Sequence, residues 1–99
     1  MKVQFCFTAK VWLYSGAAAW HFVNVDKKIA TTLKKRYGGQ ARGFGSLPVE
    51  VRIGKTTWQT SIFPDSQSGT YLLPIKVKVR RSEKVGDGDL VQVRLSVRE

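Results

Sequence analysis

The sequence has one cysteine, one histidine and no long hydrophobic run. Cys6 has no second cysteine to form a disulfide with, which is typical of proteins from reducing compartments. No apolar segment approaches the roughly 20 residues that cross a membrane. Gln4, Thr8 and Lys10 interrupt the apolar N-terminal stretch, which argues against a signal peptide. We therefore expect a cytoplasmic protein with no membrane partner.

Residues that usually carry catalysis or hold metals are also scarce. His21 stands alone, so no metal site and no cofactor are predicted. Nothing in the sequence marks Cys6 as a nucleophile activated by His21. Asp87 and Asp89 flank a glycine, which favours capping of a turn over acid–base chemistry. We predict no catalytic residue, and although enzymatic activity stays open, a non-catalytic role is favoured.

Positive charge is abundant in this chain. Seventeen lysines and arginines against seven acidic residues give a net charge of +10. Such a balance favours polyanionic partners such as DNA or RNA. The alternative is a charged surface that only confers solubility. The charge therefore limits the class of partner and says nothing about the fold.

Alternating apolar residues dominate the rest of the sequence and predict β-strands. In the first strand, residues 3–14, the odd-numbered side chains are expected to face inward. Gly54-Lys55-Thr56 resembles the end of a phosphate-binding loop, but it joins two alternating runs and is better interpreted as a hairpin turn. The other expected strands cover about residues 18–25, 47–53, 58–63, 70–75 and 90–97.

One segment has helical periodicity instead. Ile29, Ala30, Leu33 and Tyr37 follow one another at helical spacing, and Asp26 is a suitable N-cap. These residues predict an α-helix over about 26–37, which should end at the glycine that follows.

The two halves of the chain show a weak internal parallel. Each half has a strand, a Ser-Gly pair, a second strand, a basic segment, a glycine-containing loop and a last strand; the Ser-Gly pairs are Ser15-Gly16 and Ser68-Gly69. This order indicates a duplication in which two halves pair about a pseudo-twofold axis and close a small barrel. By this parallel residues 75–82 form a short helical turn that begins at Pro74. The β-branched alternation of this segment favours a strand instead, and both interpretations stay open.

Several short motifs then carry a family resemblance, beginning with Leu73-Pro74, Val79-Arg80 and Gly88-Asp89-Leu90-Val91. With Trp20-His21-Phe22-Val23 and Gly69-Thr70-Tyr71, they resemble a family of small bacterial domains of unknown function. Its members occur alone or fused to a YdeI-like segment of the OmpD-associated, bacteriocin-protection type. The resemblance implies a fold similar to the double-split β-barrel of AbrB and MazE-type regulators, which bind DNA as dimers. It implies no function, because the activity of the family is not established.

Two sets of residues are candidates for a binding site. The leading hypothesis is nucleic-acid binding by basic clusters, with Phe44 as an added stacking surface. The competing interpretation is a solvated charged face in which Arg80 is held by Asp89. The alternative is a small-molecule or enzymatic pocket near three tryptophans: Trp12, Trp20 and Trp58. A continuous basic face would favour nucleic acid, and an aromatic pocket with a charged group would favour the alternative. The basic candidates are Lys34, Lys35, Arg36, Arg42, Lys76, Lys78 and Arg81.

The sequence thus predicts a single domain over residues 1–99. It is expected to be mainly β, a small double-split barrel with one α-helix and a short second helical turn. The sequence does not determine the oligomeric state, and a monomer is favoured.

Overall fold

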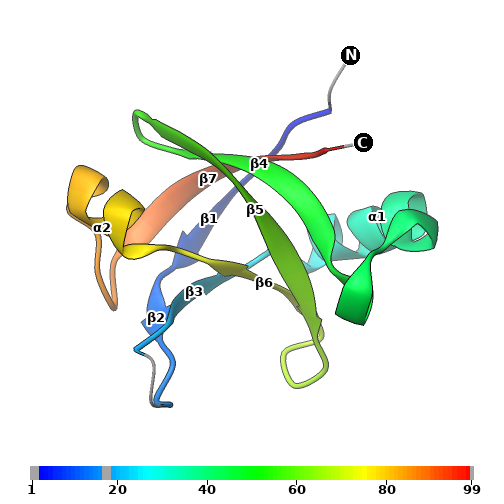
Figure 1. Ribbon diagram of the computed structural model, residues 1–99, viewed down its shortest axis with the longest axis horizontal. Coiled ribbons are helices and arrows are strands. Elements are labelled where there is room, and N and C mark those ends of the chain that lie inside the picture. Colours follow the sequence, from blue (N-terminus) through cyan, green and yellow to red (C-terminus); the bar gives the residue numbers. More distant parts are fainter. Residues whose placement is uncertain (1–2, 17–18, 99) are drawn as a thin grey trace.

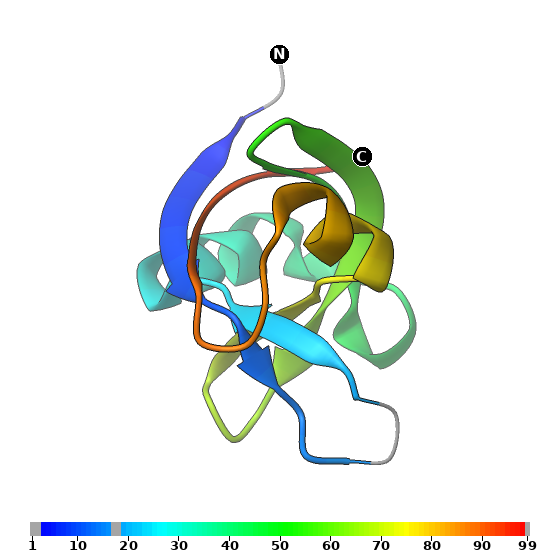
Figure 2. The same ribbon diagram turned by 90° about the vertical axis from the view of Figure 1, so that its left-hand side faces the viewer.

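Seven antiparallel strands form the sheet of the computed structural model, which describes residues 3–16 and 19–98. Their order in the sheet is β1-β7-β4-β5-β6-β3-β2. β1 and β2 are consecutive in the chain and lie at the two ends of this order, so the sheet curls into a nearly closed barrel (Figures 1 and 2). The strands are β1 (Phe5–Lys10), β2 (Trp12–Leu13), β3 (His21–Asn24), β4 (Leu47–Ile53), β5 (Thr56–Asp65), β6 (Thr70–Pro74) and β7 (Leu90–Val97).

The strand pairings agree with the predicted duplication. If β1 and β2 together correspond to β5, the pairing of β1 with β7 matches that of β5 with β4. In the same way, the pairing of β2 with β3 matches that of β5 with β6. The remaining pairs, β3 with β6 and β4 with β7, join an element to its own counterpart across the axis. The predicted mainly β barrel of two related halves is thus confirmed in its strand order.

The first strand is divided in two, contrary to the prediction of one strand over residues 3–14. Val11 is fully buried at the division, where its amide donates to Asp89 O and its carbonyl accepts from Gly88 N. Before this bend the chain pairs with β7, as β1, and after it the chain pairs with β3, as β2. Val3 is 41% exposed and Leu13 is 45% exposed, so neither residue belongs to the inward face that the sequence predicted for them. β3 is also shorter than predicted, and Ala18 lies outside the described residues.

The predicted helix is confirmed as α1 (Lys27–Tyr37). Its cap is Asp26, whose Oδ2 accepts hydrogen bonds from the amides of Lys28 and Ile29 at 3.1 and 3.2 Å. These bonds satisfy amides that have no partner within the helix. The helix ends as predicted at Gly38, which keeps a right-handed backbone and begins a 3-10 turn, Gly38–Gln40.

A second helix, α2 (Val77–Glu83), settles the ambiguous segment in favour of the internal parallel. The prediction that Pro74 opens this helix is wrong, because Pro74 is the last residue of β6 and pairs with Phe22. The pairing of β6 with β5 has already ended at Leu72, so no neighbouring strand on that side requires an amide hydrogen from the proline. Ile75, just before the helix, and Val79, within it, are both buried.

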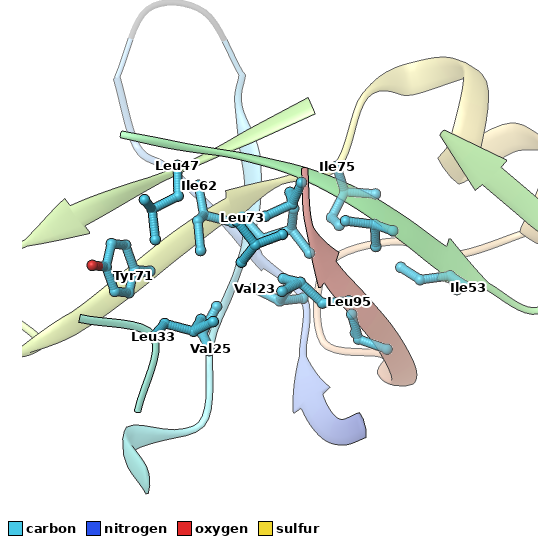
Figure 3. Packing of buried hydrophobic residues seen from close by; sticks show 14 of the residues in the cluster. Val23, Val25, Leu33, Leu47, Ile53, Ile62, Tyr71, Leu73, Ile75 and Leu95 are labelled. Atoms are coloured by element: carbon cyan, nitrogen blue, oxygen red, sulfur yellow. The ribbon is translucent and has the colours of Figure 1, made fainter. Parts of the chain in front are cut away.

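The core consists mainly of inward-facing side chains from the strands (Figure 3), and α1 covers it at one end (Figure 1). Val23, Leu73 and Leu95 are fully buried at its centre. Each buried aliphatic side chain stabilises the fold by roughly 1.5–3 kcal/mol relative to an exposed one. Between β4 and β5, Gly54 has a φ of 60°, which fits the predicted hairpin turn. The residues after this turn form strand β5, whereas a phosphate-binding loop would be followed by a helix.

Candidate functional site

The structure divides the predicted basic residues into two groups, one at each helix, and a single residue, Arg42, in a loop. Lys34, Lys35 and Arg36 lie in the last turn of α1, at the opposite end of the barrel from α2 (Figure 1). Arg36 places its guanidinium carbon 5.7 Å from the centre of the Tyr37 ring. The second group consists of Lys76, directly before α2, and of Lys78 and Arg81 on α2. Arg42 lies in the glycine loop after α1. The two groups sit on counterpart helices, as the pseudo-twofold predicts, but at opposite ends of the barrel, so they do not form the one continuous basic face that would favour nucleic acid.

The predicted pairing of Arg80 with Asp89 is wrong. The Nε of Arg80 donates to the carbonyl of Ile75 at 3.2 Å. The Asp89 carboxylate instead accepts from the amide of Gly86 at 2.8 Å. Asp87 accepts from the amide of Leu13 at 3.1 Å, so both carboxylates cap backbone amides, as the sequence indicated. Within the Arg80 guanidinium, only the Nε has a hydrogen-bond partner among the described residues, and the rest of the guanidinium can reach an outside partner.

An aromatic hollow lies on the outer face of β2, β3, β6 and the end of β5. It measures about 370 Å³ and brings together two of the three predicted tryptophans, Trp12 and Trp20. Trp58 does not line it, because this side chain faces the core from β5 and is only 9% exposed. The Nε1 of Trp58 has no hydrogen-bond partner among the described residues. The remaining aromatic walls, which the sequence did not single out, are Tyr14, Phe22 and Phe63.

Three of these rings, Trp12, Tyr14 and Trp20, form one contiguous cluster around Phe22. The Trp20 ring is nearly parallel to it, with an interplanar angle of 11° and 5.9 Å between the centres. The Trp12 ring is tilted at 5.3 Å, and its Nε1 donates to Asn24 Oδ1 at 2.6 Å, which fixes its orientation. Tyr14 and Trp20 are each 51% exposed, so large ring faces remain open to a ligand.

Cationic side chains line two neighbouring hollows, one on each side of the aromatic one. Trp12 is shared with a hollow of about 430 Å³ that is also lined by Lys10, Lys27 and Asp26. Trp20 is shared with a hollow of about 340 Å³ that is also lined by Lys76 and Arg80. The aromatic cluster therefore has two basic side chains on each flank, and Asp26 offsets part of the positive charge beside Trp12. Of the predicted basic residues, only Lys76 belongs to this arrangement.

One acidic side chain lies at the rim of the aromatic hollow. Asp65 Oδ2 accepts from Ser68 Oγ at 2.6 Å and from Ser68 N at 3.1 Å. The hydrogen bond from the Ser68 side chain, followed by that from its amide, lowers the pKa of Asp65 below its ordinary value. The carboxylate is thus negatively charged at neutral pH and can accept hydrogen bonds from a ligand.

The described residues offer no group of three His, Cys, Asp or Glu side chains that could hold a metal ion. Cys6 is exposed on β1 and paired across the sheet with Arg94, whereas His21 lies on β3 and pairs with Leu13 of β2. The Nδ1 of His21 lies 3.1 Å from the carbonyl of Ala19.

Within residues 3–16 and 19–98, no helix is long and apolar enough to cross a membrane. The aromatic hollow and its flanks are therefore the candidate site.

Comparison with known proteins places the chain in a family. No curated protein matches the sequence significantly. Residues 7–95 match the model of a domain of unknown function, DUF1905, and this segment runs from β1 into β7. Because the match covers nearly the whole barrel, the chain belongs to the DUF1905 family of domains of unknown function.

Proposed function

We propose that the protein is a non-catalytic module that binds single-stranded nucleic acid across the aromatic hollow. The observation that carries the proposal is the continuity of the three hollows. Trp12 joins the aromatic hollow to the one with Lys10 and Lys27, and Trp20 joins it to the one with Lys76 and Arg80. Stacking surfaces flanked by cations are the arrangement by which proteins hold single strands without reading a sequence.

Each part of this arrangement has a partner in a single strand. A base that stacks on an exposed ring such as Trp20 contributes about 1–3 kcal/mol. The phosphates on either side would contact the flanking lysines and Arg80, which releases condensed counterions. In a duplex the bases are already stacked and paired, so the ring faces have nothing to stack on. A single strand should therefore bind more tightly than a duplex of the same length.

A small aromatic ligand is the second candidate function, and Asp65 is the observation that favours it. A charged carboxylate at the rim of an aromatic hollow suits a planar ligand with hydrogen-bond donors. Under this alternative a free nucleoside would bind as tightly as an oligonucleotide, because the flanking cations would contribute nothing. An oligonucleotide that binds much more tightly than its nucleoside supports the first proposal.

Several expectations from the sequence form part of this proposal. The resemblance to AbrB and MazE-type barrels supports a nucleic-acid partner by analogy of fold. The YdeI-like and OmpD-associated fusions suggest that the barrel serves as a binding module beside other segments. We keep a cytoplasmic location, supported by the exposed thiol of Cys6, and a monomer, supported by a barrel that already holds both related halves.

The test is fluorescence anisotropy with a labelled single strand of ~15 nucleotides, its duplex and the free nucleoside. At low salt the single strand is expected to bind most tightly, with a log–log salt slope of about −0.7 for each phosphate neutralised. Trp20→Ala should weaken binding about 5-fold to 150-fold, which corresponds to 1–3 kcal/mol of lost stacking. Phe44→Ala is the matched control, because Phe44 is 97% exposed and does not line the hollow.

Two outcomes would contradict the proposal. One is no detectable binding of the single strand at about 50 mM salt, where electrostatic attraction is strong. The other is an equal loss of affinity in Trp20→Ala and Phe44→Ala, which would show that stacking is not confined to the aromatic hollow and involves the glycine loop. Because both rings are exposed, neither change should unfold the protein, and circular dichroism verifies this.

A further inference from the structure

The basic residues at the end of α1 take no part in the aromatic site, and two of them line a different and larger cavity. Lys34 and Lys35 contribute to a groove of about 960 Å³ between α1, the glycine loop and the β5–β6 turn. Cavities of about 300–1,000 Å³ are the usual size of small-molecule sites. The groove shares Asp65 and Thr70 with the hollows described above, but neither its lysines nor its aromatic ring, so phosphate binding on its helical wall does not depend on the proposed function.

The groove is built from side chains of complementary chemistry. One wall is a single face of α1, which presents Thr31, Lys34 and Lys35. The floor includes Tyr71, which is only 5% exposed. Figure 3 shows the Tyr71 oxygen pointing away from the aliphatic core residues. Burial raises the pKa of Tyr71, so its hydroxyl stays a neutral hydrogen-bond donor at physiological pH.

The opposite wall of the groove carries acceptors and open backbone. Asp65 is the last residue of β5, and Ser66 follows it in the turn to β6. Gly69 lies beside them with a φ of 74°, and a Cβ built there would meet nothing within 4 Å, so the ligand side of this turn is unobstructed. The small side chains of Ala30 and Ala41 leave further room between the walls. The groove is therefore cationic on its helical wall and hydrogen-bonding on its turn wall.

We propose that this groove binds a phosphomonoester with a hydroxyl-bearing body, the chemistry shared by sugar phosphates and nucleoside monophosphates. A phosphomonoester carries nearly two negative charges at neutral pH, which matches the two lysines better than one carboxylate would. The Tyr71 hydroxyl donates to the same group or to the ester oxygen. The Asp65 carboxylate then accepts from the hydroxyls of the body, away from the phosphate. Inorganic phosphate lacks the hydroxyl-bearing body, so it would contact only the helical wall of the groove.

The test is a two-dimensional amide NMR titration of the full chain with ribose 5-phosphate, AMP, ribose and inorganic phosphate. At least one phosphomonoester is expected to shift the amides of Ala41, Ser66 and Gly69 and to bind at least ten times more tightly than inorganic phosphate. The stronger of ribose 5-phosphate and AMP shows whether the body is a sugar or a nucleoside. Failure of both to bind at millimolar concentration, or binding no tighter than that of inorganic phosphate, overturns the proposal.

Two variants separate this site from general charge attraction. Lys34→Gln/Lys35→Gln should lower the affinity at least tenfold, while Lys78→Gln/Arg81→Gln removes the same charge from α2 and should leave the affinity within twofold. All four side chains are exposed, so both proteins should fold. Tyr71→Phe removes only the hydroxyl and should also weaken binding. Equal losses in the two charge variants would overturn the proposal, whatever the outcome at the aromatic site.

Discussion

Replacing Gly54 with alanine should loosen the attachment of α2 to the β4–β5 hairpin. Gly54 sits in the hairpin turn with a φ of 60°, and a Cβ at this position would overlap Oε1 of Glu83, the last residue of α2. Oε2 of the same carboxylate accepts a hydrogen bond from Thr56 Oγ1 at 2.5 Å. To admit the methyl group, Glu83 must swing away and give up this bond.

The expected cost has two parts. Alanine in a left-handed conformation costs about 1–2 kcal/mol. A hydrogen bond to a charged group contributes about 1.5–3 kcal/mol, and the lower end applies because Glu83 is only half-buried. Together they give a loss of about 3 kcal/mol in the free energy of unfolding. For a domain of this size, that lowers Tm by roughly 12–24 °C.

A double-mutant cycle with Glu83→Ala separates the two parts. In the Glu83→Ala background no carboxylate is displaced, so Gly54→Ala should cost only the backbone strain of about 1–2 kcal/mol. Urea denaturation of the four proteins gives the coupling energy, which is expected to be at least about 1 kcal/mol. Costs that add to within about 0.5 kcal/mol would refute the reasoning, because residues that do not interact behave additively.

Three further predictions concern stability. Asp26→Ala removes the cap of α1 and should lower the free energy of unfolding by about 1 kcal/mol in urea denaturation; no change would contradict the capping role. Leu73→Ala opens a cavity at the core centre and should cost about 2–5 kcal/mol in the same assay, whereas a loss below about 1 kcal/mol would place Leu73 outside a packed core. The hydrogen bonds from Ser68 lower the pKa of Asp65 in the folded state, so the charged carboxylate stabilises the fold above its ordinary pKa near 3.8, and this stabilisation is lost as the pH falls through the folded-state pKa. Asp65→Asn should therefore flatten the acidic part of a curve of Tm against pH. An unchanged curve would contradict the role of Ser68.

Much of the fold could be predicted from the sequence because the relevant signals are local. The helix from Lys27 to Tyr37 has an apolar face at helical spacing and an aspartate cap, and both act within one or two turns. For residues 75–82, the internal parallel favoured a helix against the β-branched alternation, and the helix is present. The alternation was misleading because Val77 is exposed and only Ile75 and Val79 reach the core.

The features that the sequence did not predict depend on partners that are distant in the chain. The division of the first strand at Val11 arises from bonds to Gly88 and Asp89, which no local pattern reveals. The same holds for Arg80, whose partner is a carbonyl group of the backbone.

The candidate site was predicted in part for a similar reason. Trp12 and Trp20 were correctly grouped, but Trp58 lies on the inward face of a strand whose register is set by its neighbours. Tyr14 and Phe22 share the outward alternation of Trp12 and Trp20, and this pattern of outward aromatics is the signal that could have identified the whole cluster.

The most direct test of the proposed interface uses the three tryptophan indole N–H signals in an NMR titration with a single-stranded oligonucleotide. Single Trp→Phe variants assign the signals. We predict that the signals of Trp12 and Trp20 shift together as the strand is added, while that of Trp58 stays fixed because its ring lies in the core. Unchanged Trp12 and Trp20 signals on a bound strand would contradict the proposed interface, because binding would then occur away from the aromatic hollow.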